Sequence, residues 1–353
     1  MTLLIYGANG YTGALIARRA AAQGVAAVLS GRHGSAVAAL ARELGLPHRV
    51  FGADDAPAAV AALRGAKALL NCAGPFSQTA AALVSACLRA QVHYLDITGE
   101  IDVLEHVAGR DAEARAAGVT VMPGAGFDVV PSDCLAAYVA GRLPSACHLA
   151  LAFDAGTTMS RGTAFTSIEN AAGGGVIRRD GRLVRVPSGW RTRSIDLGEG
   201  VRKAITIPWG DVATAFHSTG IGNVVTYVAL PLAARVGLRV ARGLGPLLAS
   251  PAIKRALRAR VEKRPPGPSA EQRTHGASRL WAEARDDNGA VVRARLRTPE
   301  PYELTTWTAL DLAVRAARGT LPIGFQTPSR ACGADYILQF PGVAREDVDD
   351  SGG

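Results

Sequence analysis

Cysteine is scarce in this sequence, and its few positions argue against two kinds of stabilising chemistry. The chain of 353 residues holds five cysteines, an odd number spread widely along it. They stand at Cys72, Cys87, Cys134, Cys147 and Cys332. They form no C-x-x-C pair and no Cys/His cluster with the spacing of a structural zinc site. The sequence therefore predicts neither a disulfide framework nor a bound metal.

Aromatic residues are also few, at 5% of the chain, whereas glycine occurs 40 times. Hydrophobic residues make up 48% and charged residues 20%, which is typical of a globular protein of about two domains. We expect a core of small aliphatic side chains. The start of the chain, Met1–Gly7, lacks the basic segment of a secretory signal peptide, and we expect a cytoplasmic protein with reduced cysteines.

The net charge of +9 is concentrated in one segment. Nine basic residues and one acid lie between Arg235 and Arg264, so this stretch carries +8 and the remainder about +1. The segment has no interleaved aromatics, and nucleic-acid binding is not predicted. An uncharged run at 212–234 is long enough to raise the question of a membrane span, but its Thr, Gly, Asn and Pro residues make it a poor one.

Short β-rich runs and helical segments alternate through the first 125 residues. Strands are predicted at 2–6, 25–29, 48–51, 67–70, 92–95 and 119–122, and helices at 13–23, 35–44, 56–63, 79–90 and 102–117. Each parallel connection needs a crossover, so this alternation predicts an α/β fold with an N-terminal Rossmann-type, doubly wound parallel sheet. We assign residues 1–129 to this domain.

The alternation stops after this domain. Strands are predicted at 149–153, 183–186, 201–207 and 278–296, the last interrupted by the turn Asp286–Gly289. These strands predict a second α+β domain, at 130–298, that contains an antiparallel sheet. We expect residues 299–344, with a helix at 302–318, to return to the first domain, and 345–353 to be a flexible tail.

A glycine-rich loop follows the first strand. It reads Gly7, Ala8, Asn9, Gly10, Tyr11, Thr12, Gly13, a G-x-x-G-x-x-G variant of the dinucleotide-binding pattern. Glycine permits the tight turn, lets the backbone approach a pyrophosphate and allows close helix–strand packing. The N–H groups of the next helix then face the phosphates. The place of the loop, between a strand and a helix, favours cofactor binding over a plain turn.

The end of the second strand distinguishes between the two pyridine nucleotides. It reads Ser30-Gly31-Arg32-His33, with no carboxylate to accept a hydrogen bond from a ribose 2′-hydroxyl. Arg32 is suited to a 2′-phosphate, although it is also compatible with a solvated loop position. NADPH is therefore the predicted cofactor, with Ser30 and Arg32 among its contacts.

Three later strand ends carry glycine with polar residues. Since ligands of such sheets lie beyond the carboxyl ends of the strands, two of them are predicted to contact the cofactor. The residues are Asn71, Cys72, Ala73, Gly74 and Pro75 after the fourth strand, and Gly126, Phe127 and Asp128 after the sixth. Asp96 and Thr98, after the fifth, fit a site or a helix cap equally well. Cys72 has no histidine nearby in sequence, and we do not interpret it as a nucleophile.

Together these motifs resemble the saccharopine dehydrogenase-like family. The resemblance rests on 7–13, 30–32, 71–75, Tyr94–Glu100 and Pro123–Asp128, and on Gly324–Ser329 near the end of the chain. Within the family the chain is most similar to trans-acting enoyl reductases, which serve polyketide-type lipid assembly. The resemblance implies a Rossmann domain, NADPH, and reduction of a carbon–carbon double bond in an acyl chain.

The predicted function is therefore that of an NADPH-dependent oxidoreductase acting on a small-molecule or carrier-bound acyl substrate. Alternatives are a non-catalytic NADP-binding module that docks on lipid or protein surfaces, and a reductase or dehydrogenase of an imine or amine, as in the wider family. No residue has a diagnostic catalytic spacing. The sequence does not determine the source of the proton that the α-carbon needs: it could be Tyr94, a water held by Asp128, or solvent.

The basic segment at 235–264 fits a peripheral role. Arg235, Arg239 and Arg242 share one helical stripe, and Ile253, Leu257 and Val261 form an apolar stripe beside basic residues. Such helices suit the inner face of a membrane or an acidic carrier protein. They are equally consistent with surface helices whose apolar faces pack on the second domain.

Overall fold

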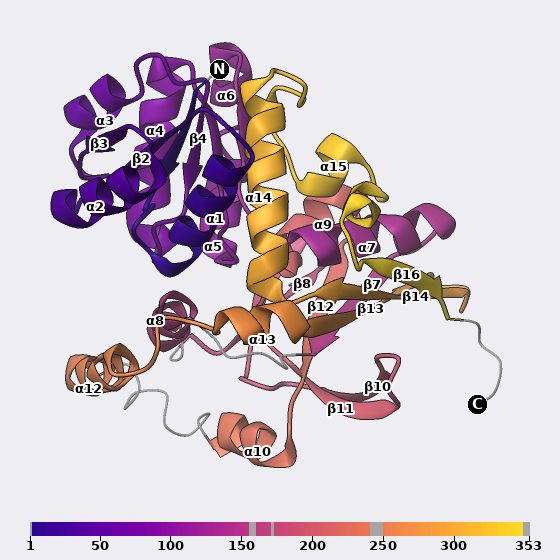
Figure 1. Cartoon of the computed structure of the whole chain (residues 1–353). Helices are drawn as coiled ribbons and strands as arrows, with labels where there is room; N and C mark the ends of the chain where they lie inside the picture. The colour runs from indigo at the N-terminus through magenta and orange to yellow at the C-terminus, as the bar shows by residue number, and fades with distance from the viewer. Residues whose placement is uncertain (1, 155–159, 171–172, 241–249, 349–353) are drawn as a thin grey trace. The chain divides into compact units, whose positions relative to one another are not determined.

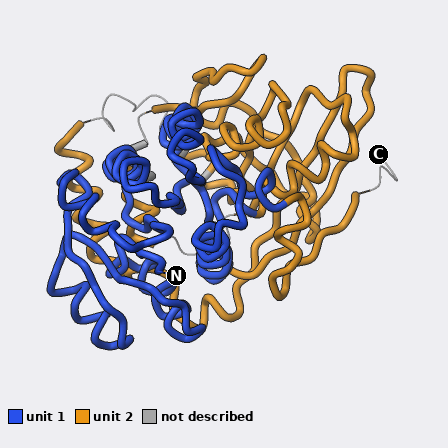
Figure 2. The backbone as a smooth tube through the Cα atoms, turned by 90° about the horizontal axis from the view of Figure 1, so that it is seen from above, with its two compact units in different colours: residues 1–130, 302–332 blue, residues 131–301, 333–353 orange. Residues whose placement is uncertain are grey.

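The computed structural model describes residues 2–154, 160–170, 173–240 and 250–348 (Figure 1). The chain divides into two compact units, drawn in two colours in Figure 2. The first contains residues 1–130 and 302–332, and the second residues 131–301 and 333–353. The first unit is thus assembled from two separate stretches of the chain.

A seven-stranded parallel sheet forms the centre of the first unit. Its strand order is β15-β6-β5-β4-β1-β2-β3, and every neighbouring pair is parallel. The strands are β1 (Leu3–Tyr6), β2 (Ala27–Gly31), β3 (His48–Val50), β4 (Ala68–Asn71), β5 (His93–Asp96), β6 (Thr120–Met122) and β15 (Gly324–Phe325). The order reverses between β1 and β4, where such sheets bind ligands. The predicted Rossmann-type sheet is confirmed.

Helices connect these strands. They are α1 (Tyr11–Ala22), α2 (Gly34–Leu44), α3 (Ala56–Ala62), α4 (Phe76–Ala90), α5 (Ile101–Ala108) and α6 (Asp111–Ala117). β1 and β4 are buried along their whole length, because helices cover both faces of a parallel sheet. Leucine, isoleucine and alanine fill this core, as the scarcity of aromatics predicts.

Helix α14 (Pro301–Ala317) brings the C-terminal part of the chain back to the first unit, followed by β15 and α15 (Pro328–Cys332). Arg19 of α1 pairs with Glu303 at 2.5 Å and lies over the Trp307 ring. The Thr308 hydroxyl donates to the carbonyl oxygen of Ala125 at 2.9 Å. α14 therefore supports both the first helix and the turn that follows β6.

The second unit contains a nine-stranded mixed sheet. Its main order is β10-β11-β12-β7-β13-β14-β16, and β8 joins β12 to β9. The strands are β7 (His148–Asp154), β8 (Gly175–Arg179), β9 (Arg182–Val186), β10 (Thr192–Asp196), β11 (Val201–Thr206), β12 (Asn223–Ala229), β13 (Ala277–Arg285), β14 (Val291–Pro299) and β16 (Ala344–Asp347). The predicted α+β domain with antiparallel strands is confirmed, although β7 and β12 pair in parallel.

The helices of this unit are α7 (Val130–Arg142), α8 (Arg161–Asn170), α9 (Asp211–Thr219), α10 (Leu232–Val240), α12 (Pro251–Glu262), α13 (Ala270–His275) and the short 3₁₀ helix η2 (Tyr336–Gln339). The uncharged run at 212–234 is divided among α9, β12 and the start of α10. Among the described residues, no helix has the length and hydropathy to cross a membrane.

The end of the chain differs from the expectation. The first unit takes back residues 302–332, whereas the return was expected to extend from 299 to 344. Residues 345–347, assigned to a flexible tail at 345–353, belong to β16, which pairs with β14 from Ala294 to Arg297. This mostly exposed edge strand has three charged residues in a row and no run of alternating apolar residues, so the sequence did not predict it. The last five residues lie outside the described part.

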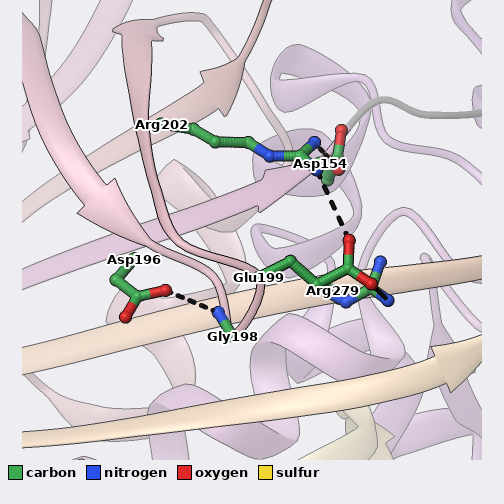
Figure 3. A network of polar contacts seen from close by, with 6 residues as sticks. All are labelled: Asp154, Asp196, Gly198, Glu199, Arg202 and Arg279. Carbon is green, nitrogen blue, oxygen red and sulfur yellow. Dashed lines mark hydrogen bonds and ion pairs between the residues drawn. The ribbon is translucent and has the colours of Figure 1, made fainter.

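Ion pairs join the hairpin of β10 and β11 to strands β7 and β13 of the same sheet (Figure 3). Arg202 Nη1 lies 2.6 Å from Asp154 Oδ2 on β7, and Glu199 pairs with Arg279 on β13. The Gly198 N–H donates to Asp196 Oδ1 at 2.9 Å within the turn itself. Contacts with strands distant in sequence thereby fix this hairpin.

Candidate functional site

The glycine loop lies at the switch point of the parallel sheet. Gly7, with φ +75°, follows β1 directly, and a Cβ on it would lie 2.8 Å from the Ala73 nitrogen. Such a close approach excludes any side chain at position 7. The loops after β1 and β4 therefore meet, and they bring the predicted residues 7–13 and 71–75 together.

Gly10 and Gly13 have different local roles. A Cβ on Gly13 would lie 2.3 Å from the Gly7 carbonyl oxygen, so this glycine is needed for α1 to pack against the loop. Gly10 is exposed, has φ −73°, and a Cβ there would meet only the Gly7 oxygen, at 3.2 Å. The N-cap residue of α1 is Gly10, which has no side chain to cap the helix, and the first turn of the helix has no acid. The start of the helix thus offers N–H groups and open space to an anion, as a pyrophosphate requires.

The end of β2 lies beside this loop. A Cβ on Gly31 would be 3.0 Å from Asn9 Oδ1, so the two turns are in close contact. The Arg32 side chain is exposed and carries its Nε 3.1 Å from Nε2 of His33. Ser30 is fully buried, and its hydroxyl has no hydrogen-bond partner among the residues that the structure describes. The exposed Arg32 guanidinium is suited to a 2′-phosphate, and a contact between the cofactor and the buried Ser30 hydroxyl stays a prediction.

The side chain of Asn71, at the end of β4, is engaged within the protein. Its Oδ1 accepts from the Ala73 N–H at 2.9 Å, and its Nδ2 donates to Thr79 at 3.1 Å and to Tyr94 at 3.2 Å. These bonds fix the loop at 72–75 next to Gly7. Asn71 thus shapes the predicted site, and a direct contact between its side chain and the cofactor stays a prediction.

A buried polar network continues from Asn71 to β5. The Tyr94 hydroxyl donates to Asp96 Oδ2 at 2.8 Å, and Asp96 Oδ1 accepts from the N–H groups of Thr98 and Gly124 at 2.9 Å each. Burial raises the pKa of Asp96 to about 6, because desolvation outweighs these hydrogen bonds. The same burial raises the pKa of Tyr94 well above its usual value. Tyr94 is fully buried, so its suggested role as proton donor to a substrate is wrong for this structure; it is a positioning residue.

The turn after β6 lies against the turn after β5. A Cβ on Gly99 would be 3.0 Å from Asp128 Oδ2, so the half-buried Asp128 carboxyl packs directly on backbone. Desolvation raises the pKa of Asp128 to about 6. The Phe127 N–H donates to the Thr305 hydroxyl at 3.0 Å, and Gly126 faces the same threonine. Helix α14 therefore holds the predicted residues 126–128 in place.

Sequence reasoning missed three residues that build this edge of the sheet. Glu100 accepts from the N–H groups of Phe76 and Ser77, at 2.8 and 3.0 Å, and so caps α4 from another element. The other two are Thr305 and Thr308. Glu100 belongs to the motif Tyr94–Glu100, but the sequence does not show that it caps α4, because it lies 24 residues after the start of that helix. The threonines are about 180 residues from the turn that they support.

Cys72 is not an activated nucleophile. Burial, together with the charge of Asp96, raises the pKa of its thiol. The thiolate, which is the reactive form, is therefore disfavoured at neutral pH. The structure thus agrees that Cys72 is not a nucleophile, and its contact with the cofactor stays a prediction.

The basic segment belongs to the second unit, away from this sheet in sequence. α12 packs against α8, where the Arg258 guanidinium lies over the Phe165 ring, and Val261 of its apolar stripe is buried. On α10, Leu232 and Val236 are exposed, at 67% and 48%. Arg242 lies outside the described residues. Docking on a membrane or a carrier through 235–264 stays a prediction.

The N-terminal part of the first unit matches a known sequence family. Residues 3–122 match the sequence family described as saccharopine dehydrogenase NADP binding domain. A trans-acting enoyl reductase from Mycobacterium leprae is 31% identical over 140 residues, which cover 37% of this chain and 33% of that protein. A saccharopine dehydrogenase-like oxidoreductase from Mus musculus is 29% identical over 161 residues, covering 40% and 38%. The matched regions thus span about a third of the length of these relatives.

Solved structures extend the likeness to the whole fold. Apo saccharopine dehydrogenase (L-Glu forming) from Saccharomyces cerevisiae has a TM-score of 0.67 and 11% identity, with 99% of this chain and 100% of that chain covered. Homospermidine synthase from Legionella pneumophila, solved with NAD, has a TM-score of 0.62 and 10% identity, covering 99% and 91%. At such low identity the match establishes the fold alone. The predicted resemblance to the saccharopine dehydrogenase-like family is confirmed.

Proposed function

From an N-terminal unit whose residues 3–122 are a saccharopine dehydrogenase NADP-binding domain, we propose that the chain is an NADPH-dependent oxidoreductase that reduces a carbon–carbon double bond next to an acyl carbonyl. The proposal has two parts, a cofactor and an acceptor. The cofactor part is supported by the geometry of the glycine loop. The acceptor part is supported by relatives that bear the name trans-acting enoyl reductase.

The observation that carries the proposal is the open start of α1 beside Arg32. Gly10 has no side chain to obstruct a pyrophosphate, and the backbone at the start of α1 would supply N–H donors to it. Arg32 stands where a carboxylate would select the unphosphorylated ribose. These residues would hold NADPH through its phosphates and leave the rest of the strand edge to the substrate.

The nicotinamide supplies hydride when it is bound, and the protein must manage a proton and a developing negative charge. Asp128 suits the first task, because a carboxyl with a pKa of about 6 exchanges a proton readily near neutral pH. It would hold the water from which the α-carbon takes its proton. The neutral Cys72 thiol offers no nucleophile, so a covalent route is not part of the proposal.

The experiment is a substrate screen with the intact chain. NADPH consumption is followed by absorbance with crotonyl-CoA and longer trans-2-enoyl thioesters, and the saturated thioesters serve as controls. We expect consumption with at least one enoyl thioester, formation of the saturated product, and none with the controls. Binding of NADPH without turnover of any enoyl thioester would overturn the acceptor part and leave the cofactor part standing.

A second candidate is reduction of an imine. It is favoured by the whole-chain fold shared with saccharopine dehydrogenase and homospermidine synthase. Imines formed in place from a keto acid and an amine are therefore the second arm of the screen. Consumption of NADPH in that arm alone would replace the enoyl proposal.

A third candidate is a non-catalytic NADP-binding module that docks through residues 235–264. The exposed Leu232 and Val236 beside the basic residues of this segment favour it. Binding to anionic vesicles, with no turnover in either arm of the screen, is the result expected of such a module.

A further inference from the structure

Three side chains of the second unit meet at one end of strand β7. Cys147 and His148 are neighbours at the start of the strand, and Asp287 lies in the turn between β13 and β14, 140 positions after Cys147. The Cys147 sulfur is 3.2 Å from Asp287 Oδ1, and His148 Nε2 is 3.6 Å from the same oxygen. One ligand atom from each residue lies within 4.8 Å of the other two.

The backbone holds the cysteine and the histidine in place. The Cys147 N–H donates to the carbonyl oxygen of Arg285 at 3.0 Å, and its own carbonyl accepts from Asn223 Nδ2 at 3.0 Å. His148 is paired with Asn223 on β12 and with Arg285 on β13. The backbone of both ligands is therefore fixed between two strands, so binding of an ion would have to order only their side chains.

The turn that carries Asp287 is also fixed, by its neighbour. Asp286 accepts from the Ala290 N–H at 2.8 Å and from the Ser145 hydroxyl at 2.8 Å. Gly289 has φ +90°, which closes the turn. Asp286 thus serves the turn, and Asp287 directs its carboxylate toward Cys147 and His148.

We propose that Cys147, His148 and Asp287 bind a divalent transition-metal ion, with Zn²⁺ the best match. Zinc takes sulfur, imidazole nitrogen and carboxylate oxygen at about 2.0–2.3 Å in a tetrahedron, which places its ligands roughly 3.3–3.7 Å from one another. The separations of 3.2 and 3.6 Å agree with that arrangement. Three protein ligands leave the fourth position to water, and the 85% exposure of the Asp287 side chain leaves that position open.

The chemistry of the ligand set selects among metals. A thiolate and an imidazole favour zinc, copper or cobalt over magnesium and calcium, which take oxygen ligands. When the ion binds, the sulfur–metal bond forms and the thiol proton passes to solvent. Thiolate and carboxylate then carry two negative charges against the two positive charges of the ion. Bound metal would tie the start of β7 to the β13–β14 turn.

The test uses the full chain without a histidine tag, stripped of metal with a chelator. Zn²⁺ alone is titrated by calorimetry, and Co²⁺ is added separately to read the ligand type by absorption. We expect one equivalent of Zn²⁺ per chain and a thiolate-to-cobalt charge-transfer band. Cys147→Ser should abolish the band, whereas Cys332→Ser, at another partly exposed cysteine, should keep it.

Two further variants keep the test decisive if Cys147→Ser fails to fold. Asp287→Asn changes a side chain that is 85% exposed, and His148→Gln one that is 42% exposed, so both should fold. Each should weaken Zn²⁺ binding by about 100-fold or more, since even outer-shell changes cost 10–100-fold. Unchanged affinity in both variants, less than half an equivalent of Zn²⁺ on the wild-type chain, or a cobalt band lost equally in Cys332→Ser, would overturn the proposal.

Discussion

Gly10 and Gly13 are three residues apart in one loop, and the structure predicts different consequences for changing them. Gly10→Val should abolish NADPH binding, because the branched side chain would fill the approach of the pyrophosphate. Its backbone, with φ −73° and ψ 167°, accepts valine, and its Cβ would lie 3.2 Å from the Gly7 oxygen, so the free energy of unfolding should fall less than in a Gly13→Ala chain. Calorimetric titration with NADPH and thermal unfolding measure the two effects.

Gly13→Ala is the matched comparison. Its Cβ would lie 2.3 Å from the Gly7 oxygen, so α1 must shift, and we expect a loss of about 1–3 kcal/mol in the free energy of unfolding. A Gly10→Val chain that binds NADPH like the wild type would contradict the assignment of the loop. A Gly13→Ala chain of unchanged stability would contradict the close packing of α1 against the Gly7 carbonyl.

Arg32 carries the choice between the two nucleotides. Arg32→Ala should weaken NADPH binding by about 1–3 kcal/mol, the range for hydrogen bonds to a charged group, and leave NADH binding nearly unchanged. Arg42→Ala, at an exposed arginine on α2, is the control and should alter neither. An equal loss of affinity for both nucleotides would contradict a contact between Arg32 and the 2′-phosphate.

Asp96 gives the chain a particular pH dependence. Its carboxyl has a pKa of about 6 when folded and 3.8 ordinarily, so the folded chain keeps a proton that the unfolded chain releases. The free energy of unfolding therefore contains a contribution that falls as the pH rises from about 4 to 6, by up to about 3 kcal/mol, and is constant above. Asp96→Asn should lose this contribution. Urea unfolding at a series of pH values measures it.

The control for this prediction is Asp102→Asn, an exposed carboxyl in the same unit, whose stability curve should run parallel to that of the wild type. Asp128, with a pKa also raised to about 6, is intact in both variants and does not affect the comparison. Identical slopes for Asp96→Asn and the wild type between pH 4 and 6 would contradict the buried, protonated carboxyl.

At the scale of elements, α4 depends on a cap supplied by another loop. Glu100 accepts two N–H groups at the start of this helix. Glu100→Ala should lower the free energy of unfolding by about 1–2 kcal/mol, the usual cost of losing a cap. The urea midpoint should hardly change in Asp102→Ala, and a loss of equal size there would refute a specific role for Glu100.

The sequence predicts elements well where the evidence is local. β1, β2, β4, β5 and β6 were found because strands buried on both faces read as apolar runs between helices. β15 has two residues and gains its place only by pairing with β6, so no pattern marks it. β12 was hidden in the uncharged run at 212–234, where strand and helix cannot be told apart by apolar content alone.

The same limit applies to the candidate site. The roles of the loop at 7–13 and of Arg32 can be predicted from the sequence, because each lies in a short run of residues directly after a strand. Other contacts join segments more than a hundred residues apart. Thr305 accepts a hydrogen bond from Phe127, and Cys147 lies next to Asp287. Such contacts arise from tertiary pairing and leave no spacing in the sequence.

At the scale of the whole molecule, the first unit cannot be cut out as a single stretch. Residues 1–130 lack α14, whose Leu304, Leu310 and Leu312 are buried and whose threonines support the turn at 125–127. We expect the isolated fragment 1–130 to show no cooperative unfolding transition and no NADPH binding. A fragment that unfolds cooperatively and binds NADPH would show that the returning segment is dispensable.

Calorimetric titration of the intact chain with NADPH and, separately, with NADH measures whether the glycine loop binds a pyridine nucleotide and which one it prefers. The glycine loop at the start of α1 and the guanidinium of Arg32 predict one NADPH per chain, bound at least ten times more tightly than NADH. Absence of heat with either nucleotide, or tighter binding of NADH, would contradict the account.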